Sequence, residues 1–392
     1  MPRIYLLAGF LALLAAAVTP AQNPRTEPPK PVPSSIPEKL SGVRWQSQYF
    51  YDKSKEILSI RDLRFASPAR GVAVGELLVE KGKRGKPVSI VTSDGGAHWQ
   101  LTPIEEHPVS LYFLNETAGW LVTTDGLWRT DEAGKSWHKL HHFPSGMWVV
   151  HFNDEQHGFT AGSKKRAYRT EDGGEHWNAI DAAAEPPGDP KFSVYNWISF
   201  ASPEHGVISG WNRPPNRFPP EFPDWMDPES AVYRREGPHL TYVLTTNDGG
   251  ATWKSSSASV FGEITRIRVL PGGSGVGLIE YGNGFKTPSE VYHLDWRTGK
   301  NNTLYRNNRF ATTDVWQTAA GAVYMGGIEV AGQVRGVVPG KVKVLQSRNT
   351  DASVWAEIPV DYRAVANRVI FGGFGDSLWM ATDNGMILKL ER

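Results

Sequence analysis

Four short segments share the pattern T-x-[D/E]-x-G-x-x-W, and their spacing constrains the fold more than any other feature of the chain. They begin at Thr92, Thr130, Thr170 and Thr246. Their tryptophans are separated by 38, 40 and 76 residues. Repeats of about 40 residues are typical of β-propeller blades, each built from four antiparallel strands. The last gap is close to two such periods, so an insertion accounts for it without an additional blade.

The residues around each segment match one blade. An alternating apolar run precedes a polar turn and a run of small residues, which predicts two strands; a third strand ends at the threonine and a fourth starts near the tryptophan. Threonine and aspartate oxygens can accept hydrogen bonds from turn N–H groups, glycine tolerates positive φ, and tryptophan anchors the hairpin by burial. The residues assigned to this role are Thr92, Asp94, Gly96, Trp99, Thr130, Glu132, Gly134, Trp137, Thr170, Asp172, Gly174, Trp177, Thr246, Asp248, Gly250 and Trp253.

One of the four segments departs from the others. Glu132 stands where the other three have aspartate, and its longer carboxylate is expected to cap the turn less well. The four segments together resemble the Asp-box, or bacterial-neuraminidase, repeats. That resemblance implies a β-propeller with the boxes on outer hairpins, away from any catalytic centre. It therefore favours an architectural role for the repeats over a chemical one.

The downstream sequence predicts three further blades, less regular than the first four. The last segment, "RVIFGGFGDSLWMATDNGMILKL", supplies only three strands. The missing fourth is "GVRWQSQYF", residues 42–50, with Trp45 as the counterpart of the other tryptophans. The prediction is an all-β, seven-bladed propeller closed by its N-terminal strand, which leaves no long open edge. Six and eight blades are the alternatives.

The N-terminal region predicts export. Residues 1–21 combine Arg3, an apolar run and a small-residue cleavage site, as in a signal peptide, with a retained anchor as the alternative. Residues 22–40 read as a Pro-rich linker and 41–392 as the propeller, with an insertion at 213–238. No cysteine is available for disulfides or lipidation. We expect a periplasmic or secreted protein with no stable membrane span after cleavage of the signal.

Charge is balanced overall but concentrated locally. With 42 basic and 41 acidic residues, the chain lacks the basic excess of general nucleic-acid binders. Loops joining the second and third strands of blades one, three and four are basic, and blade topology puts them on one face. Solvated loop tips are one reading and a binding surface is the other. The candidate binding residues are Lys81, Lys83, Arg84, Lys86, Lys164, Lys165, Arg166, Arg213, Arg217, Trp225, Arg234 and Arg235.

Sequence patterns that would indicate a catalytic site are weaker than the repeat pattern. Glycoside hydrolysis needs two nearby carboxylates, and the candidates are Glu76, Glu280, Glu329, Asp224, Asp227 and Glu229. The histidines of "WHKLHHF", His138, His141 and His142, are spaced too widely along a strand for two of them to hold one ion. The chain has no phosphate-binding glycine loop and no nucleophile elbow. We expect no catalytic residue, metal or cofactor, and keep an extracellular glycoside hydrolase as the alternative function.

Two segments carry a closer resemblance. "LNETAGWLVTTDGLWRTDEAGKSWHKL" and "FNDEQHGFTAGSKKRAYRTEDGGEHWNAI" are similar to blades of the photosystem II stability/assembly factor family of secreted propellers. The resemblance implies a non-enzymatic scaffold that binds protein partners through an arginine-rich patch. The insertion at 213–238 departs from the compact blades of that family. We therefore expect a protein or peptide partner, with carbohydrate as a further option.

Overall fold

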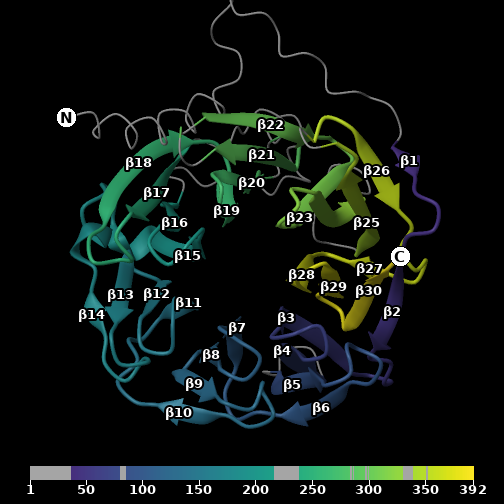
Figure 1. Cartoon of the computed structure of the whole chain (residues 1–392), viewed down its shortest axis with the longest axis horizontal. Helices are drawn as coiled ribbons and strands as arrows, with labels where there is room; N and C mark the ends of the chain where they lie inside the picture. Colours follow the sequence, from purple (N-terminus) through teal and green to yellow (C-terminus); the bar gives the residue numbers. More distant parts are fainter. Residues whose placement is uncertain are drawn as a thin grey trace, which may run out of the picture.

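A computed structural model describes nine stretches of the chain: residues 37–79, 85–215, 238–282, 285, 287–295, 298, 300–329, 339–349 and 352–392. These residues form seven antiparallel sheets arranged around a central axis (Figure 1). In the described part of the chain the helices are two short 3-10 turns, Asp181–Ala183 and Pro190–Phe192. The seven-bladed, all-β prediction is confirmed.

Each blade runs from an innermost strand at the axis to an outermost strand at the rim (Figure 1). Blade one consists of β3 (Ile57–Phe65), β4 (Gly71–Leu78), β5 (Lys86–Thr92) and β6 (Gln100–Pro103), and blade two of β7 (Pro108–Phe113), β8 (Gly119–Thr123), β9 (Leu127–Thr130) and β10 (His138–Leu140). Blade three consists of β11 (Met147–Phe152), β12 (Gly158–Gly162), β13 (Arg166–Thr170) and β14 (Asn178–Ala179). Blade four consists of β15 (Ser193–Phe200), β16 (Gly206–Asn212), β17 (His239–Thr246) and β18 (Lys254–Val260).

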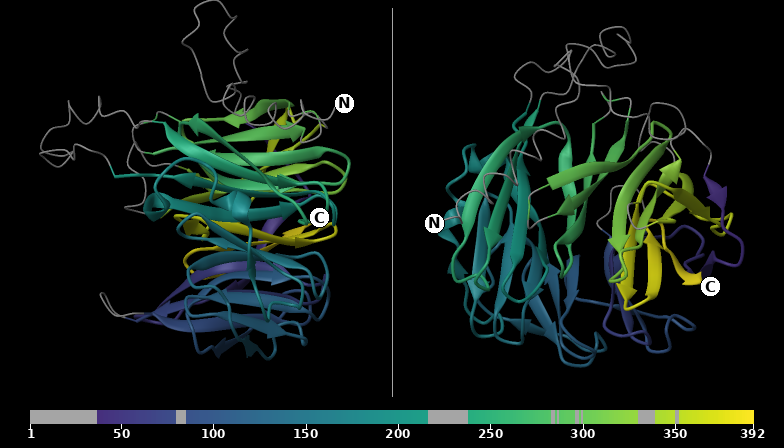
Figure 2. Two further views of the ribbon diagram at one scale, coloured as in Figure 1. Left: turned by 90° about the vertical axis from the view of Figure 1, so that its left-hand side faces the viewer. Right: turned by 45° about the horizontal axis from the view of Figure 1, so that its top comes forward.

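The remaining blades follow the same order. Blade five consists of β19 (Glu263–Val269), β20 (Ser274–Glu280), β21 (Ser289–Asp295) and β22 (Lys300–Arg306). Blade six consists of β23 (Phe310–Gln317), β24 (Val323–Glu329), β25 (Gly340–Ser347) and β26 (Trp355–Ile358). Blade seven consists of β28 (Val369–Phe374), β29 (Ser377–Thr382), β30 (Met386–Glu391) and the N-terminal β2 (Arg44–Phe50). Side views show the blades standing next to one another, with their connections at the two faces of the ring (Figure 2). A short strand, β27 (Val365–Ala366), pairs with β25.

The N-terminal strand closes the ring as predicted. β2 pairs antiparallel with β30, so that Trp45 lies opposite Leu390. Trp45 is buried and its ring lies 5.8 Å from that of Phe371. The preceding strand β1 (Glu38–Lys39) adds in parallel to β26 of blade six. β1 corrects the linker boundary, because the end of the 22–40 segment pairs with the propeller.

A phenylalanine and a glycine six residues later set the inner turn of the first four blades. Phe65 ends β3 and Gly71 begins β4. A Cβ on Gly71 would lie 2.4 Å from the Phe65 ring, so the ring occupies the place of a side chain. The motif tryptophan of the same blade, Trp99, packs edge-on against Phe65 at 6.0 Å. The same phenylalanine–glycine contact recurs in Phe113 and Gly119, Phe152 and Gly158, and Phe200 and Gly206.

The four motif turns connect the third and fourth strands, and their hydrogen bonds explain the pattern. In the first, Thr92 Oγ1 accepts from the Gly96 N–H at 2.9 Å and Asp94 Oδ1 accepts from the His98 N–H at 2.9 Å. The motif glycines have φ between 83° and 104°. In the second turn the described acceptor contact of the Glu132 carboxylate is with the Ser136 hydroxyl at 2.6 Å. The weaker cap expected at Glu132 stays a prediction; it agrees with the backbone N–H that each motif aspartate accepts four residues on in the other three turns.

Candidate functional site

A cavity of about 330 Å³ lies at one end of the central channel. It is lined by the last residues of the innermost strands of all seven blades. Those strands end at the connections to the second strands, which lie on the same face as the four motif turns. The side chains that give the cavity its chemistry are Arg64, Tyr112, His151, Trp197, Arg268 and Trp316.

Two buried aspartates tie neighbouring innermost strands together. Both follow a register shift in their strand, β3 for Asp62 and β23 for Asp314. Asp62 Oδ2 accepts from the Leu111 N–H of blade two, and Asp314 Oδ2 accepts from the Phe371 N–H of blade seven, each at 2.8 Å. In both cases Oδ1 accepts from the next residue's N–H at 2.9 Å. The same device therefore joins blade one to two and blade six to seven.

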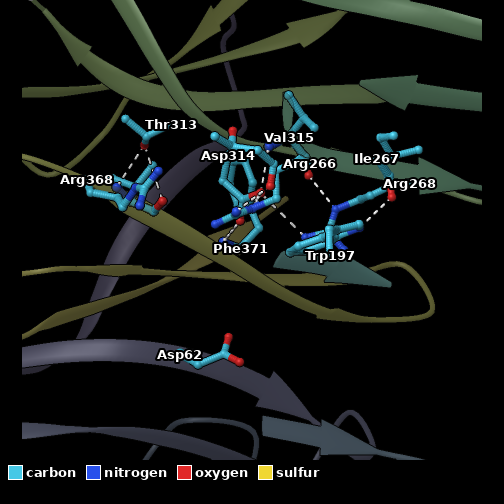
Figure 3. Close-up of polar contacts among 12 residues, drawn as sticks. Asp62, Trp197, Arg266, Ile267, Arg268, Thr313, Asp314, Val315, Arg368 and Phe371 are labelled. Carbon is cyan, nitrogen blue, oxygen red and sulfur yellow. Dashed lines mark hydrogen bonds and ion pairs between the residues drawn. The ribbon is translucent and has the colours of Figure 1, made fainter. Parts of the chain in front are cut away.

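Asp314 also binds two arginines from β19, as Figure 3 shows. Arg266 Nε donates to Asp314 Oδ1 at 3.1 Å, and Arg268 Nη2 lies 3.6 Å from the same oxygen. Burial alone would raise the pKa of Asp314, but the two guanidinium groups and the backbone N–H donors outweigh it and lower that pKa. Asp314 is thus an ionised carboxylate in a buried position.

Arg268 is held between two indole rings. Its Cζ lies 4.7 Å from the Trp316 ring centroid and 5.3 Å from that of Trp197, and its Nε donates to the Val315 carbonyl at 2.7 Å. Its side chain is 17% exposed, and Nη2 has no hydrogen-bond partner among the described residues. Burial lowers the pKa of Arg268 to about 10, which leaves it charged at neutral pH. Arg268 is therefore a planar, fixed cation in the cavity wall, with Nη2 turned towards the Asp314 carboxylate.

The cavity wall contributed by blades two to four is aromatic and neutral. His151 stacks on Phe200 at 4.6 Å and lies 4.8 Å from the Tyr112 ring. Burial lowers the pKa of His151 to about 4, so its imidazole is uncharged at neutral pH. Burial likewise raises the pKa of Tyr112, whose hydroxyl donates to the Phe152 carbonyl at 2.7 Å. The arrangement offers cations on one side and flat neutral rings on the other.

The described residues of the predicted binding surface, Lys86, Lys164 and Arg213, adjoin connections between second and third strands, on the opposite face from this cavity. Lys86 and Lys164 are exposed, and Lys164 and Lys165 form a tight turn with φ near 60°. Arg166 Nη2 donates to the Ser145 carbonyl at 2.7 Å, and Arg213 pairs with Glu263 at 2.7 Å. Seven of the predicted residues lie outside the described part of the chain: Lys81, Lys83, Arg84, Arg217, Trp225, Arg234 and Arg235.

Lys165 corrects the sequence-based expectation of an exposed charge. Its side chain folds back into the molecule and the residue is 7% exposed. Its Nζ donates to the Pro186 carbonyl and lies 5.9 Å from the Tyr242 ring centroid. The turn geometry that exposes Lys164 directs the next side chain inward, so Lys165 does not contribute to a surface patch.

Three of the carboxylates proposed for hydrolysis are described, and each has a basic partner. Glu76 lies 3.3 Å from His107, Glu280 lies 2.6 Å from Arg368, and Glu329 lies 3.5 Å from Lys343. Asp224, Asp227 and Glu229 lie outside the described residues. Where the structure describes the chain, no three His, Asp or Glu side chains are grouped to hold a metal.

The histidines of "WHKLHHF" do not form a cluster around a common point. His141 and His142 have ring centroids 6.3 Å apart, and His142 stacks on His176 of the next blade at 5.5 Å. His138 lies at the start of β10.

As for membrane insertion, none of the helices in the described regions is long and apolar enough to cross a bilayer.

Comparison with known proteins supports the architecture. No family model matches the chain. The photosystem II assembly lipoprotein Ycf48 of Synechococcus sp. (strain CC9902) is 27% identical over 191 residues, which are 44% of this chain and 56% of that protein. The match thus spans little more than half of that relative's length.

Solved structures show the same fold at low sequence identity. A structure described as YCF48 bound to D1 peptide has a TM-score of 0.58 at 15% identity, covering 91% of this chain and 100% of that one. YCF48 from Cyanidioschyzon merolae has a TM-score of 0.55 at 16% identity, covering 89% and 98%. Virginiamycin B lyase from Staphylococcus aureus has a TM-score of 0.53 at 10% identity, covering 89% and 99%. At these identities the likeness shows a shared propeller fold.

Sequence analysis did not anticipate the Arg268 site. Arg266 and Arg268 alternate in "EITRIRVL", as side chains on one face of a strand do. Trp197 and Trp316 occupy the innermost strands of blades four and six. An alignment of the innermost strands of all seven blades would predict the site, because residues at the same position along each strand line the same level of the central channel.

Proposed function

We propose that this chain is an exported, non-enzymatic propeller that binds a protein partner during assembly, and that an acidic group of the partner docks at Arg268. One observation carries the proposal: the charged guanidinium of Arg268, stacked on Trp197 and Trp316, forms part of the wall of the central cavity. Fixed cations flanked by aromatic rings are typical of the energetic centres of protein interfaces. The four motif turns, which we assign to Asp-box repeats, support the scaffold.

The similar proteins agree with this role. One is named an assembly lipoprotein, and a propeller of similar fold has been solved with a bound peptide. The exposed basic residues of the opposite face, Lys86, Lys164 and Arg213, are proposed as a second contact area. The glycoside hydrolase alternative gains no support, since Glu76 and Glu280 are each held in an ion pair.

The test separates the two faces. The mature protein is used to capture partners from native periplasm, and captured proteins are cut into overlapping peptides for direct binding by fluorescence anisotropy. We expect Arg268→Gln to weaken binding of the best acidic peptide at least tenfold, a loss typical of a buried charged contact. Lys86→Glu/Lys164→Glu tests the second contact area separately. Equal affinity of wild type and the folded Arg268→Gln protein would exclude the central cavity as the docking site.

A further inference from the structure

The outermost strands of the seven blades form the rim of the ring (Figure 1), and six of them are protected against pairing with another chain. β6, β10 and β14 are only four, three and two residues long. β22 contains a bulge and has a basic residue at each end. β26 is covered by β1, and β2 by the chain after β26, where the Trp45 N–H donates to the Pro359 carbonyl at 2.8 Å. Short length, bulges, charge and coverage are the usual protections of native edge strands.

β18, the outermost strand of blade four, has none of these protections. It is seven residues long and pairs with β17 in an unbroken register, from His239 opposite Val260 to Thr245 opposite Lys254. It contains no proline, and its one charged residue is Lys254 at its start. No hydrogen bond between described residues reaches the outer side of its backbone. β18 therefore presents a regular row of N–H and C=O groups at the rim.

The connection nearest to β18 lies against a face of the strand and not along its edge. The Ser255 hydroxyl donates to the Glu185 carboxylate, which belongs to the connection between β14 and β15. Side chains of a strand project from the two faces of its sheet, whereas its backbone N–H and C=O groups lie in the plane of the sheet. This contact therefore leaves the outer backbone groups of β18 accessible to another strand.

The fold already accepts an additional strand at the rim. β1 pairs with β26 and extends the sheet of blade six beyond the four strands of a blade. Addition of a strand to an exposed sheet edge is a common mode of association, because each backbone group of the edge gains a hydrogen-bond partner. The same addition is open to β18, provided that the incoming strand has suitable side chains.

The sequence of β18, KSSSASV, suits a second copy of the same strand. An antiparallel pair centred on Ser257 aligns all seven residues of both copies. It places Lys254 opposite Val260, Ser255 opposite Ser259, and Ser256 opposite Ala258. No like charges oppose each other, serine hydroxyls face serine hydroxyls, and the small side chains allow two rims to approach closely.

We propose that two copies of this propeller associate by antiparallel pairing of β18 with β18, around a twofold axis at Ser257. The sheet of blade four then continues into blade four of the second copy. Because each copy uses the same edge, the contact closes on itself and gives a dimer rather than a fibre. One pair of seven-residue strands is smaller than a standard interface of about 1,200–2,000 Å², so the dimer should dissociate on dilution. This inference goes beyond the proposed function and does not depend on Arg268.

The first experiment is analytical ultracentrifugation of the whole mature protein from micromolar to millimolar concentration. We expect a monomer–dimer equilibrium in the wild type. Ser257→Lys puts two lysines directly opposite each other across the twofold axis, so its dissociation constant should rise at least about tenfold. Asn302→Lys adds the same charge at an exposed position of β22 and should leave the equilibrium unchanged. Circular dichroism confirms that both variants are folded.

The second experiment uses the absence of cysteine from the chain. Ser257→Cys is nearly isosteric, so it covers the case in which Ser257→Lys does not fold. A short bismaleimide should cross-link Ser257→Cys about ten times faster than Asn302→Cys, because strand pairing raises the effective concentration of the two thiols. A wild type that stays monomeric at millimolar concentration, or equal cross-linking rates in the two cysteine variants, would overturn the proposal and leave the edge of β18 to a strand of a different protein.

Discussion

Trp379 Nε1 donates to the carbonyl oxygen of Gly95 at 3.2 Å, which joins residues 284 positions apart. The Trp379 ring is fully buried and stacks on Phe65 at 3.6 Å. The junction of blades two and three repeats the contact, since Trp120 Nε1 donates to the Gly173 carbonyl at 3.3 Å and its ring stacks at 3.6 Å. The seventh blade is therefore locked to the first by the same device that joins consecutive blades.

Replacing Trp379 should weaken this closure. Trp379→Phe keeps a ring on Phe65 but loses the hydrogen bond and some apolar area, so the free energy of unfolding should fall by about 2 kcal/mol. Chemical denaturation followed by circular dichroism measures it. Trp148→Phe, at a residue that is 37% exposed, is the control and should change stability by less than about 0.5 kcal/mol. A comparable loss in both variants would mean that the contact does not hold the ring closed.

The second motif turn can be improved. Glu132→Asp shortens the carboxylate and lets it accept from the Ser136 N–H, as Asp172 does from the His176 N–H at 2.9 Å. We expect a gain of about 0.5–1 kcal/mol in the free energy of unfolding, the usual effect of a capping hydrogen bond. The reverse change, Asp172→Glu, should cost a similar amount. Thermal denaturation compares the two, and changes of the same sign would contradict the capping argument.

Asp314 and Asp62 provide a matched pair. Both accept two backbone N–H groups, but Asp314 also faces two arginines, Arg266 and Arg268, whereas Asp62 faces the more exposed Arg64 at 3.4 Å. Asp314→Asn leaves two buried guanidinium groups without their carboxylate and should cost about 3 kcal/mol, whereas Asp62→Asn should cost about 1 kcal/mol. Urea denaturation of both variants gives the comparison. Equal losses would show that Arg266 and Arg268 together add no more to Asp314 than Arg64 adds to Asp62.

His151 should make stability depend on pH. Its folded pKa of about 4 is below its unfolded value of about 6.5, so the unfolded chain binds the extra proton. Stability from this residue is complete above about pH 7 and is lost as pH falls from 6.5 towards 4, by roughly 1 kcal/mol per pH unit. His151→Phe should keep the stack on Phe200 and flatten that slope. Denaturation midpoints at five pH values test it, and an unchanged slope would assign the dependence to other groups.

Repetition made the fold predictable. The 40-residue period and the motif turns predict seven blades, and Trp45 predicts the closing strand. The site was harder to predict from the sequence, because Arg268, Trp197 and Trp316 lie on three different blades and meet only through the curvature of the ring. The prediction of Lys165 as a surface charge was wrong, because the residue types of a two-residue turn do not show which of the two side chains points inward.

The pairing of β2 with β30 also has a consequence for how the chain is made. Arg44 lies near the start of the chain and its partner Glu391 near the end. A ribosome therefore delivers β2 long before β30 exists, and β2 must wait unpaired while the six intervening blades are synthesised. Ring closure is a checkpoint for complete synthesis: a chain that stops before residue 386 retains an open sheet edge, which proteases and chaperones recognise.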